Sequence, residues 1–201
     1  MKIILIVSVI VAVLFIIFQI YVVMSADKTE TQAYKVLLTK DNFEIRFYPA
    51  ATMATITSSA KSYKELGSSG FRKLAGYIFG GNEGAHKISM TTPVRMDIND
   101  SIATMSFIMP SKYDSGNLPK PNDRQVRIKT IPDEYVAAIR FSGYASDEDV
   151  KINTETLKKL LTENKINYYG NFRLLAYNAP YQVSNRRNEV IVNVEWTKAN
   201  K

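Results

Sequence analysis

The sequence predicts an α+β fold in which two ββαββ units follow an N-terminal membrane-spanning helix. The first two dozen residues are almost entirely apolar. After them, segments that alternate apolar and polar residues lie on both sides of two helical segments, and a polar proline-rich loop divides the two sets. We expect the sheets of the two units to close on each other about a pseudo-two-fold axis, with one helix of each unit outside.

The N-terminal apolar run extends from Ile3 to Met24 without a charged residue. As a helix it spans about 33 Å, enough to cross a hydrocarbon core of about 30 Å. A cleavable signal peptide with Lys2 as its charged region is the alternative, and it would give a secreted protein. The run is longer than a usual signal-peptide core, and Met24-Ser25-Ala26 is a poor cleavage site. We therefore predict an uncleaved single-pass anchor over residues 1–26, a tether over 27–33 and a soluble domain over 34–197 outside the cytoplasm.

The composition excludes several kinds of site. The chain has 201 residues, no cysteine, one histidine and a net charge of +7. Without cysteine there is no disulfide, no cysteine nucleophile and no thiolate metal ligand. The positive charge favours anionic partners, including carboxylate-bearing ligands and anionic lipid headgroups, but no dense run of lysine and arginine indicates nucleic acid.

The first unit begins with a segment in which Phe43, Ile45 and Phe47 alternate with polar residues, as in a half-buried strand. A capping-box pattern, Ser62 to Glu65, then opens a helix. The elements expected in this unit are strands at Tyr34–Leu38 and Phe43–Phe47, a hairpin partner of the latter at Thr52–Thr57, a helix with the apolar stripe Leu66, Phe71, Leu74 and Ile78, and strands at Val94–Ile98 and Ala103–Met109.

Three glycines interrupt this helix, Gly67, Gly70 and Gly76. Each weakens the helix by up to about 1 kcal/mol relative to alanine. They permit close approach to the backbone, either by the sheet beneath the helix or by a ligand lying across it, and the sequence leaves both interpretations open.

The second unit follows the polar loop Pro110–Arg124. Its helix is predicted from Ser146, a good N-cap, followed by three acidic residues that complement the helix dipole. Strands are expected at Gln125–Ile131, Tyr135–Phe141, Phe172–Tyr177 and Val190–Trp196, with Val150, Leu157, Leu160 and Leu161 as the buried stripe of the helix.

Few residues suggest chemistry. The glycine-rich stretch Gly80–Val94 joins the first soluble helix to the next strand and carries His86, whose imidazole could ligate a haem iron. Met90 could ligate iron or fill the core. Arg186 and Arg187 could clamp a carboxylate, or could lie in a solvated turn. No catalytic triad, zinc site or phosphate loop is visible, so we do not expect an enzyme.

Two segments resemble the signature segments of the SOUL haem-binding protein family. They are Lys87–Val94, which contains Met-Thr-Thr-Pro, and Tyr177–Val190, which contains Tyr-Asn-Ala-Pro and Asn-Arg-Arg-Asn-Glu-Val. Phe107–Tyr113 and Phe141–Tyr144 also resemble that family's pattern, in the same order along the chain. The resemblance covers about Tyr34 to Trp196.

This resemblance implies a duplicated, distorted antiparallel β-barrel flanked by two helices, and binding of haem or another tetrapyrrole in a hydrophobic cleft without turnover. We expect a membrane-anchored protein that carries or buffers haem. The expected binding residues are Phe71, Leu74, Tyr77 and Ile78 as the apolar wall, Met90 beside it, Arg186 and Arg187 for the propionates, and His86 as the candidate iron ligand.

A second hypothesis is a small-effector or protein-interaction module that uses the same cleft for another amphiphile or a protein partner. A third, weaker one is a hydrolase, which requires an acid in the cleft that the sequence does not identify.

Overall fold

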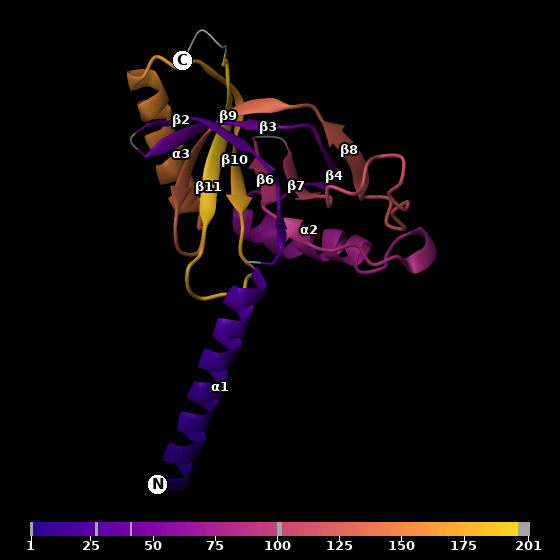
Figure 1. Cartoon of the computed structure of the whole chain (residues 1–201), viewed down its shortest axis with the longest axis vertical. Helices are drawn as coiled ribbons and strands as arrows, with labels where there is room; N and C mark the ends of the chain where they lie inside the picture. Colours follow the sequence, from indigo (N-terminus) through magenta and orange to yellow (C-terminus); the bar gives the residue numbers. More distant parts are fainter. Residues whose placement is uncertain (1, 27, 41, 100–101, 197–201) are drawn as a thin grey trace.

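The computed structural model of the chain describes residues 2–26, 28–40, 42–99 and 102–196 (Figure 1). Residues 27 and 197, which bound the predicted tether and the predicted soluble domain, lie outside these ranges. The helices of the described residues are α1 (Lys2–Ala26), α2 (Tyr63–Ile78) and α3 (Asp147–Glu163), with a short 3-10 helix, η1 (Glu83–Ala85). α1 projects from the body of the molecule, whereas α2 and α3 pack on a large sheet (Figure 1).

Nine strands form one antiparallel sheet in the order β2-β3-β9-β11-β10-β6-β7-β4-β8, and β1 pairs with β5 in a separate parallel ladder. The strands are β1 (Glu30–Thr31), β2 (Lys35–Lys40), β3 (Phe43–Tyr48), β4 (Ala51–Ser58), β5 (Thr91–Thr92), β6 (Val94–Ile98), β7 (Ala103–Ile108), β8 (Arg127–Ile131), β9 (Glu134–Phe141), β10 (Tyr168–Ala176) and β11 (Asn188–Val194).

The predicted ββαββ repeat is present, as β3-β4-α2-β6-β7 followed by β8-β9-α3-β10-β11. The sheet order is symmetric about the β10–β6 pair, because β3-β9-β11-β10 on one side corresponds to β8-β4-β7-β6 on the other. The first strand of each unit pairs with the second strand of the other unit, which gives β3–β9 and β8–β4. The two units are therefore interlocked rather than placed side by side.

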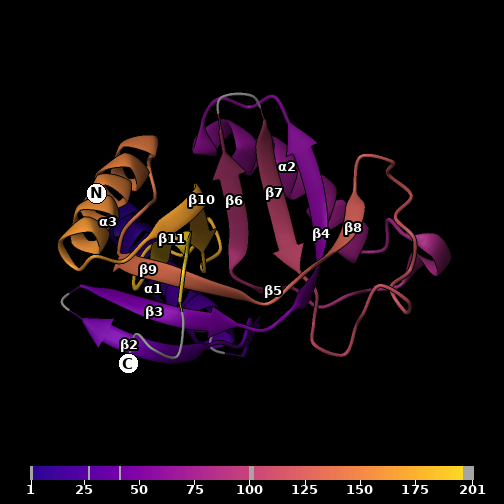
Figure 2. The same ribbon diagram turned by 90° about the horizontal axis from the view of Figure 1, so that it is seen from above.

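The prediction that the sheets close into a β-barrel is wrong, because the sheet is open with β2 and β8 at its edges. Pro49 and Pro132 lie where β3 runs into β4 and where β8 runs into β9. Proline has no N–H for a ladder and fixes its own φ, so each long strand is interrupted there and continues with other partners. The two halves of the sheet meet at the β10–β6 pair and lie at an angle to each other (Figure 2).

The expectation that Thr52–Thr57 forms a hairpin with Phe43–Phe47 is also wrong. β4 pairs with β7 and β8, whereas β3 pairs with β2 and β9. The link between β3 and β4 is Pro49-Ala50, which has the length of a tight hairpin loop. Such loops need positive φ, which glycine and asparagine supply and proline cannot, so the chain runs on instead of reversing.

Each half of the sheet is covered by its own helix. α2 packs on β4, β6 and β7, and α3 packs on β9, β10 and β11 (Figure 2). The core under α2 includes Ile56, Leu66, Leu74 and Met105, and the core under α3 includes Val150, Leu157, Leu161 and Val192. A third cluster lies on the side of the sheet opposite α3 and contains Tyr48, Val136, Ala138, Leu175, Tyr177 and Ile191.

The packing of α2 resolves the alternatives for one of its glycines. A Cβ on Gly70 would lie 2.9 Å from Ile56 Cδ1 and 3.3 Å from Met105 Sδ, so this glycine allows the helix to pack closely on the sheet. A Cβ on Gly67 or Gly76 would meet no atom within 4 Å, and these two positions are open.

α1 differs from the other two helices in its exposure. It has 25 residues, and Val22 is the one buried residue along it. Ile3, Ile10 and Phe15 are more than half exposed, as is usual for apolar side chains that face lipid rather than protein. A helix of this length and composition could be a membrane anchor or a signal sequence.

Candidate functional site

The loop after α2 is organised by a residue that the sequence analysis did not single out, Asn82. Its side-chain Nδ2 donates to the carbonyl oxygens of Tyr77 (2.7 Å) and His86 (2.8 Å), and its Oδ1 accepts from the His86 backbone N–H (2.9 Å). Gly80 and Gly84 have φ of 114° and 78°, which side chains with a Cβ rarely adopt. The loop is therefore a built structure that fixes the backbone of His86.

His86 itself is exposed, and an aromatic side chain is exposed near it. Phe79, the residue after α2, is 65% exposed, and its backbone forms an isolated antiparallel bridge with Lys87. Opposed residues of such a bridge place their side chains on the same side. The end of α2 thus carries an uncovered aromatic ring and an ammonium group on one side of the bridge, whereas the exposed imidazole of the neighbouring residue, His86, lies against Gly84.

The predicted apolar wall on α2 is mostly part of the core. Leu74, Tyr77 and Ile78 are at most 1% exposed, and the Tyr77 hydroxyl donates to Pro119 O (3.0 Å). Phe71 is partly exposed and makes an edge-to-face contact with Phe107, with ring centroids 5.2 Å apart. A ligand can reach Phe71 in this structure, but it can reach the other three only if α2 moves away from the sheet.

The Met-Thr-Thr-Pro segment receives the chain that follows α1. Met90 is partly buried against the core under α2, and β5 follows it directly. Glu30–Thr31 pairs with Thr91–Thr92 in parallel, and the Gln32 N–H donates to Thr92 O (2.8 Å). Part of the predicted tether is therefore fixed to the first signature segment.

The second signature segment surrounds a buried carboxylate that the sequence analysis also missed, Glu189. The side chain is fully buried and accepts bonds from Arg46 (2.7 and 3.1 Å), from Arg187 (2.7 and 3.0 Å) and from the Tyr177 hydroxyl (2.9 Å). Arg187 also donates to the Tyr34 hydroxyl (3.1 Å) and lies over the Tyr177 ring, 4.0 Å from its centroid.

The charges in this cluster are mutually compensating. Burial by itself raises the pKa of Glu189, but the hydrogen bonds and positive charges of Arg46 and Arg187 lower it further than burial raises it. Burial opposes the charged form of Arg187 as well, and Tyr177 and Glu189 raise the pKa of the guanidinium above its ordinary value. Arg187 is thus bound within the protein.

A matching cluster surrounds Glu134 at the start of β9. Its carboxylate accepts from Arg95 (2.6 Å), Arg173 (2.9 Å) and Asn193 (3.1 Å). Burial raises the pKa of Glu134, and the two arginines more than offset this and lower it. These contacts bridge β9, β11, β10 and β6 on the side of the sheet away from the helices.

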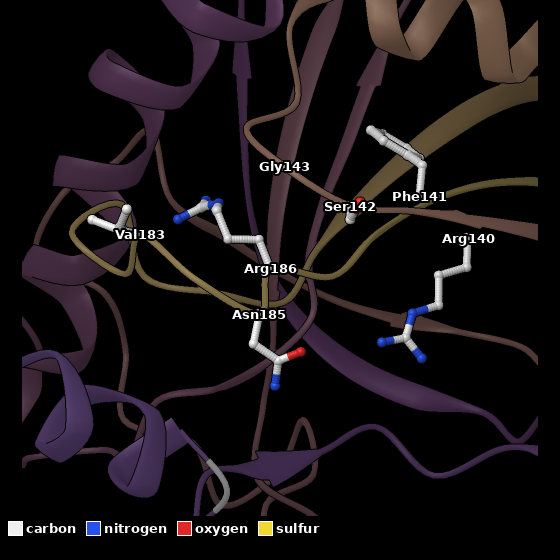
Figure 3. Close-up of a pocket in the computed structure, with 7 residues that line it drawn as sticks. All are labelled: Arg140, Phe141, Ser142, Gly143, Val183, Asn185 and Arg186. Atoms are coloured by element: carbon white, nitrogen blue, oxygen red, sulfur yellow. The ribbon is translucent and has the colours of Figure 1, made fainter.

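Arg186 has different surroundings. Its Nη1 donates to Ala179 O (2.8 Å) and Gln182 O (2.6 Å), and its guanidinium lies 4.2 Å from the centre of the Tyr144 ring. It lines an open pocket of about 600 Å³ together with Arg140, Phe141, Ser142, Gly143, Val183 and Asn185 (Figure 3). Arg140 is exposed, and it enters the pocket from β9.

The structure therefore separates the predicted site residues into two groups. His86 follows the end of α2 that points away from α1, whereas Arg186 and Arg187 belong to the loop beside the end of α1 (Figure 1). The sequence does not predict that Phe79 is exposed, because the spacing of Phe79 from the apolar residues of α2 continues their buried stripe. Arg140 alternates with apolar residues of β9, but nothing in the sequence places it beside Arg186.

The SOUL heme-binding protein family matches residues 29–193. The chain belongs to this family. "Heme-binding protein 2" of Homo sapiens is 30% identical over 169 residues, which cover 79% of this chain and 82% of the relative. "Heme-binding protein 2" of Mus musculus is 29% identical over 157 residues, which cover 74% of this chain and 76% of the relative.

Among solved structures, the C-terminal domain of EcmrR has the same fold, with a TM-score of 0.61. The match covers 82% of this chain and 99% of that domain, at 8% sequence identity. The ββαββ pair of this SOUL protein is thus shared with a protein whose sequence is very different, so the fold by itself does not specify a ligand.

Proposed function

We propose that this SOUL protein binds haem or a related tetrapyrrole, holds it beside a membrane and performs no chemistry on it. The observation that carries the proposal is the family match over nearly all of the chain after α1, with relatives that are named for haem binding. The net charge of +7 suits a ligand with two carboxylates.

The residues present fit a tetrapyrrole at the outer end of α2 better than in a preformed cavity. Phe79 offers an exposed ring against which a flat apolar ligand can lie, and His86 is the one side chain in the sequence with an imidazole for iron. Lys87 can pair with a propionate. Phe71 on α2 and Met90 just before β5 are further partly exposed apolar side chains, and both pack against the core under α2.

Bound haem would supply an iron centre, and the protein's part is to hold and cover it. The fixed loop backbone around Asn82 limits the positions of His86, so little conformational entropy is lost when the imidazole binds. Leu74 and Ile78 lie behind this surface and keep the helix in place. No acid or nucleophile is needed for this function.

The test is a haemin titration of the full chain in detergent, followed by the Soret band. Phe79→Ala and His86→Ala should each weaken binding about tenfold or more, since either change removes a contact worth roughly 1.5 kcal/mol. His86→Ala should also shift the Soret maximum if the imidazole binds iron. Tyr169→Ala, an exposed aromatic position in the other unit, is the matched control and should leave binding unchanged.

A folded protein that gives no Soret shift with haemin and does not bind other porphyrins would rule out tetrapyrrole binding. Haem binding that is unchanged in both variants would instead favour the small-effector or protein-interaction module, with haem as an incidental ligand.

We also propose that α1 stays attached and anchors the protein in a membrane, with the soluble part outside the cytoplasm. Two features support attachment: Val22 is buried against the domain, and the Gln19 side chain bonds to the loop at Tyr181 and Val183. N-terminal sequencing of the protein from membranes should find residues 1–26 in place, and carbonate washing should not release it. Recovery of a shortened, soluble protein would contradict the anchor.

A further inference from the structure

The end of α1 contacts the second signature segment as well as continuing into the domain. The Gln19 side chain donates to Tyr181 O (3.2 Å) and accepts from the Val183 N–H (3.1 Å). The rings of Phe18 and Tyr181 lie 6.1 Å apart. The loop and the last turns of α1 are therefore side by side, as Figure 1 also shows.

The position of Gln19 fixes the depth of this loop. Gln19 precedes Met24, the last residue of the apolar run, by a distance of about 7 Å along the helix axis. If the apolar run spans the hydrocarbon core, the loop tip lies about 7 Å inside the end of that run, in the outer part of the core just beneath the membrane interface. Tyr181 is 58% exposed and Val183 is 53% exposed at this tip. Tyrosine is enriched at the adjoining membrane interface because its ring is apolar and its hydroxyl is polar.

Two hollows flank the loop, and they differ in chemistry. The pocket of about 600 Å³ on one side is lined by Arg140 and Arg186, whose guanidinium groups point in different directions (Figure 3), and neither of them has an ion-pair partner among the described residues. Four other arginines of the two units each pair with a glutamate. They are Arg46, Arg95, Arg173 and Arg187. The pocket is thus lined by two positively charged side chains that no acidic side chain of the described residues neutralises.

The second hollow, of about 380 Å³, is a groove between α1 and Ser184. Its lining is almost wholly apolar: Phe15, Ile16, Ile20, Val23 and Met24, with the polar Gln19 and Ser184. The two hollows adjoin across Val183, Ser184 and Asn185. A cationic pocket joined to an apolar groove just beneath the interface matches a phosphate headgroup and its acyl chain.

We infer that the loop from Tyr181 to Arg186 is a second membrane contact of this protein and binds the headgroup phosphate of an anionic phospholipid. The inference rests on the proposed anchoring of α1. It assigns Arg186, with Arg140, to a lipid phosphate instead of a haem propionate. Together with the β1–β5 pairing, this contact holds the domain on the bilayer in one orientation.

The depth of the loop can be measured on the full chain in nanodiscs. Because the sequence has no cysteine, single substitutions Tyr181→Cys and Val183→Cys carry a spin label at one site only. For each label, the rate of collision with oxygen is divided by the rate of collision with a water-soluble nickel chelate. This ratio should be several-fold higher at Tyr181→Cys and Val183→Cys than at Tyr169→Cys. Tyr169 is the matched control because it is 54% exposed and pairs with Asn193, near the C-terminal end of β11.

A spin label at Ile10→Cys distinguishes the absence of the second membrane contact from the absence of the anchor itself. If Ile10 is in the bilayer and Tyr181 is as accessible to the chelate as Tyr169, the second contact does not exist. If Ile10 is also in water, the anchor itself fails, and haem binding is untouched by either result.

The headgroup is tested by calorimetry of the full chain in phosphatidylcholine nanodiscs, with empty nanodiscs as the blank. Dihexanoyl phosphatidylglycerol should bind more tightly than dihexanoyl phosphatidylcholine or inorganic phosphate. Arg140→Gln should weaken it about tenfold, as the loss of one charge-assisted hydrogen bond predicts. Arg127→Gln, on the edge strand β8, is the matched control for loss of an exposed arginine.

Equal binding of the two lipids would overturn the headgroup assignment. Tight binding of inorganic phosphate would show that the pocket binds a soluble anion, and this result too would overturn the headgroup assignment. If Arg140→Gln loses as much affinity for haemin as for the lipid, the pocket would be assigned to the tetrapyrrole carboxylates instead.

Discussion

On the side of the sheet away from α2, the first half of the sheet carries a neutral pair, in which the hydroxyls of Thr55 and Ser106 lie 2.9 Å apart. On the corresponding side of the second half lie the buried carboxylate of Glu189 and the mostly buried carboxylate of Glu134, each held by two arginines. The topology of the halves is the same, but one relies on close neutral packing and the other on ion pairs.

The helices differ in a related way. α2 contains three glycines and only half of a capping box, because Ser62 accepts from Glu65 N while the Glu65 side chain bonds to Lys61 N. α3 contains no glycine and has the complete box between Ser146 and Asp149. Local interactions therefore favour α3 as a helix, whereas α2 depends on its contacts with the sheet. The helix that is less stable alone is the one beside the proposed haem surface.

The largest expected effect comes from breaking the ion pairs. Glu189→Gln leaves Arg187 without an acidic partner and Arg46 with only the more exposed Glu44, and it should lower the free energy of unfolding by about 3–5 kcal/mol. Thr55→Val, which removes the hydroxyl pair of the other half, should cost about 1 kcal/mol. Urea unfolding of both variants measures the difference, and equal losses would show that the two halves do not differ in this way.

Low pH should destabilise the same half of the sheet, the half that contains the ion pairs. The folded pKa values of Glu134 and Glu189 lie below their ordinary value of 4.5. Their contribution to stability is therefore fully present above about pH 4.5 and is lost as the pH falls through the folded values. Hydrogen exchange below pH 4.5 should rise in β9 and β11 before it rises in β4 and β7. Simultaneous loss of protection in both halves would argue against a local effect.

The next largest effect on stability should come from the packing of α2 on the sheet. Substitution of two of its glycines should change the stability in opposite directions. Gly70→Ala forces its Cβ against Ile56 and should destabilise the protein by about 1–3 kcal/mol. Gly76→Ala adds a methyl group into open space and should stabilise it by up to about 1 kcal/mol. Thermal unfolding of the two variants tests this, and a loss of stability in both would mean that α2 tolerates no added volume.

The smallest effect should come from the helix caps. Ser146→Ala removes the hydroxyl of a complete box and should cost about 1 kcal/mol, and Ser62→Ala should cost somewhat less because its box is incomplete. The two losses are compared by urea unfolding. A larger loss at Ser62 would show that α2 depends on its cap more than α3 does.

The sequence was sufficient for the helices, their N-caps and the order of strands in each ββαββ unit. Those features depend on interactions between residues a few positions apart. It was not sufficient for the partners of β3 and β4, because nothing local indicates whether the chain reverses or continues at Pro49. It also could not place Arg186 and Arg140 at one pocket, since their proximity depends on the register of β9 and β11.

By itself, the sequence determined the apolar helix at the N-terminus, the doubled unit and the family signatures, all of which follow from local periodicity and composition. The tertiary structure decided that the sheet stays open, that Leu74, Tyr77 and Ile78 lie in the core while Phe79 is exposed, and that Glu189 is enclosed by arginines. These outcomes depend on which distant segments pack together. Burial and ion pairing are properties of that packing and not of any short stretch of chain.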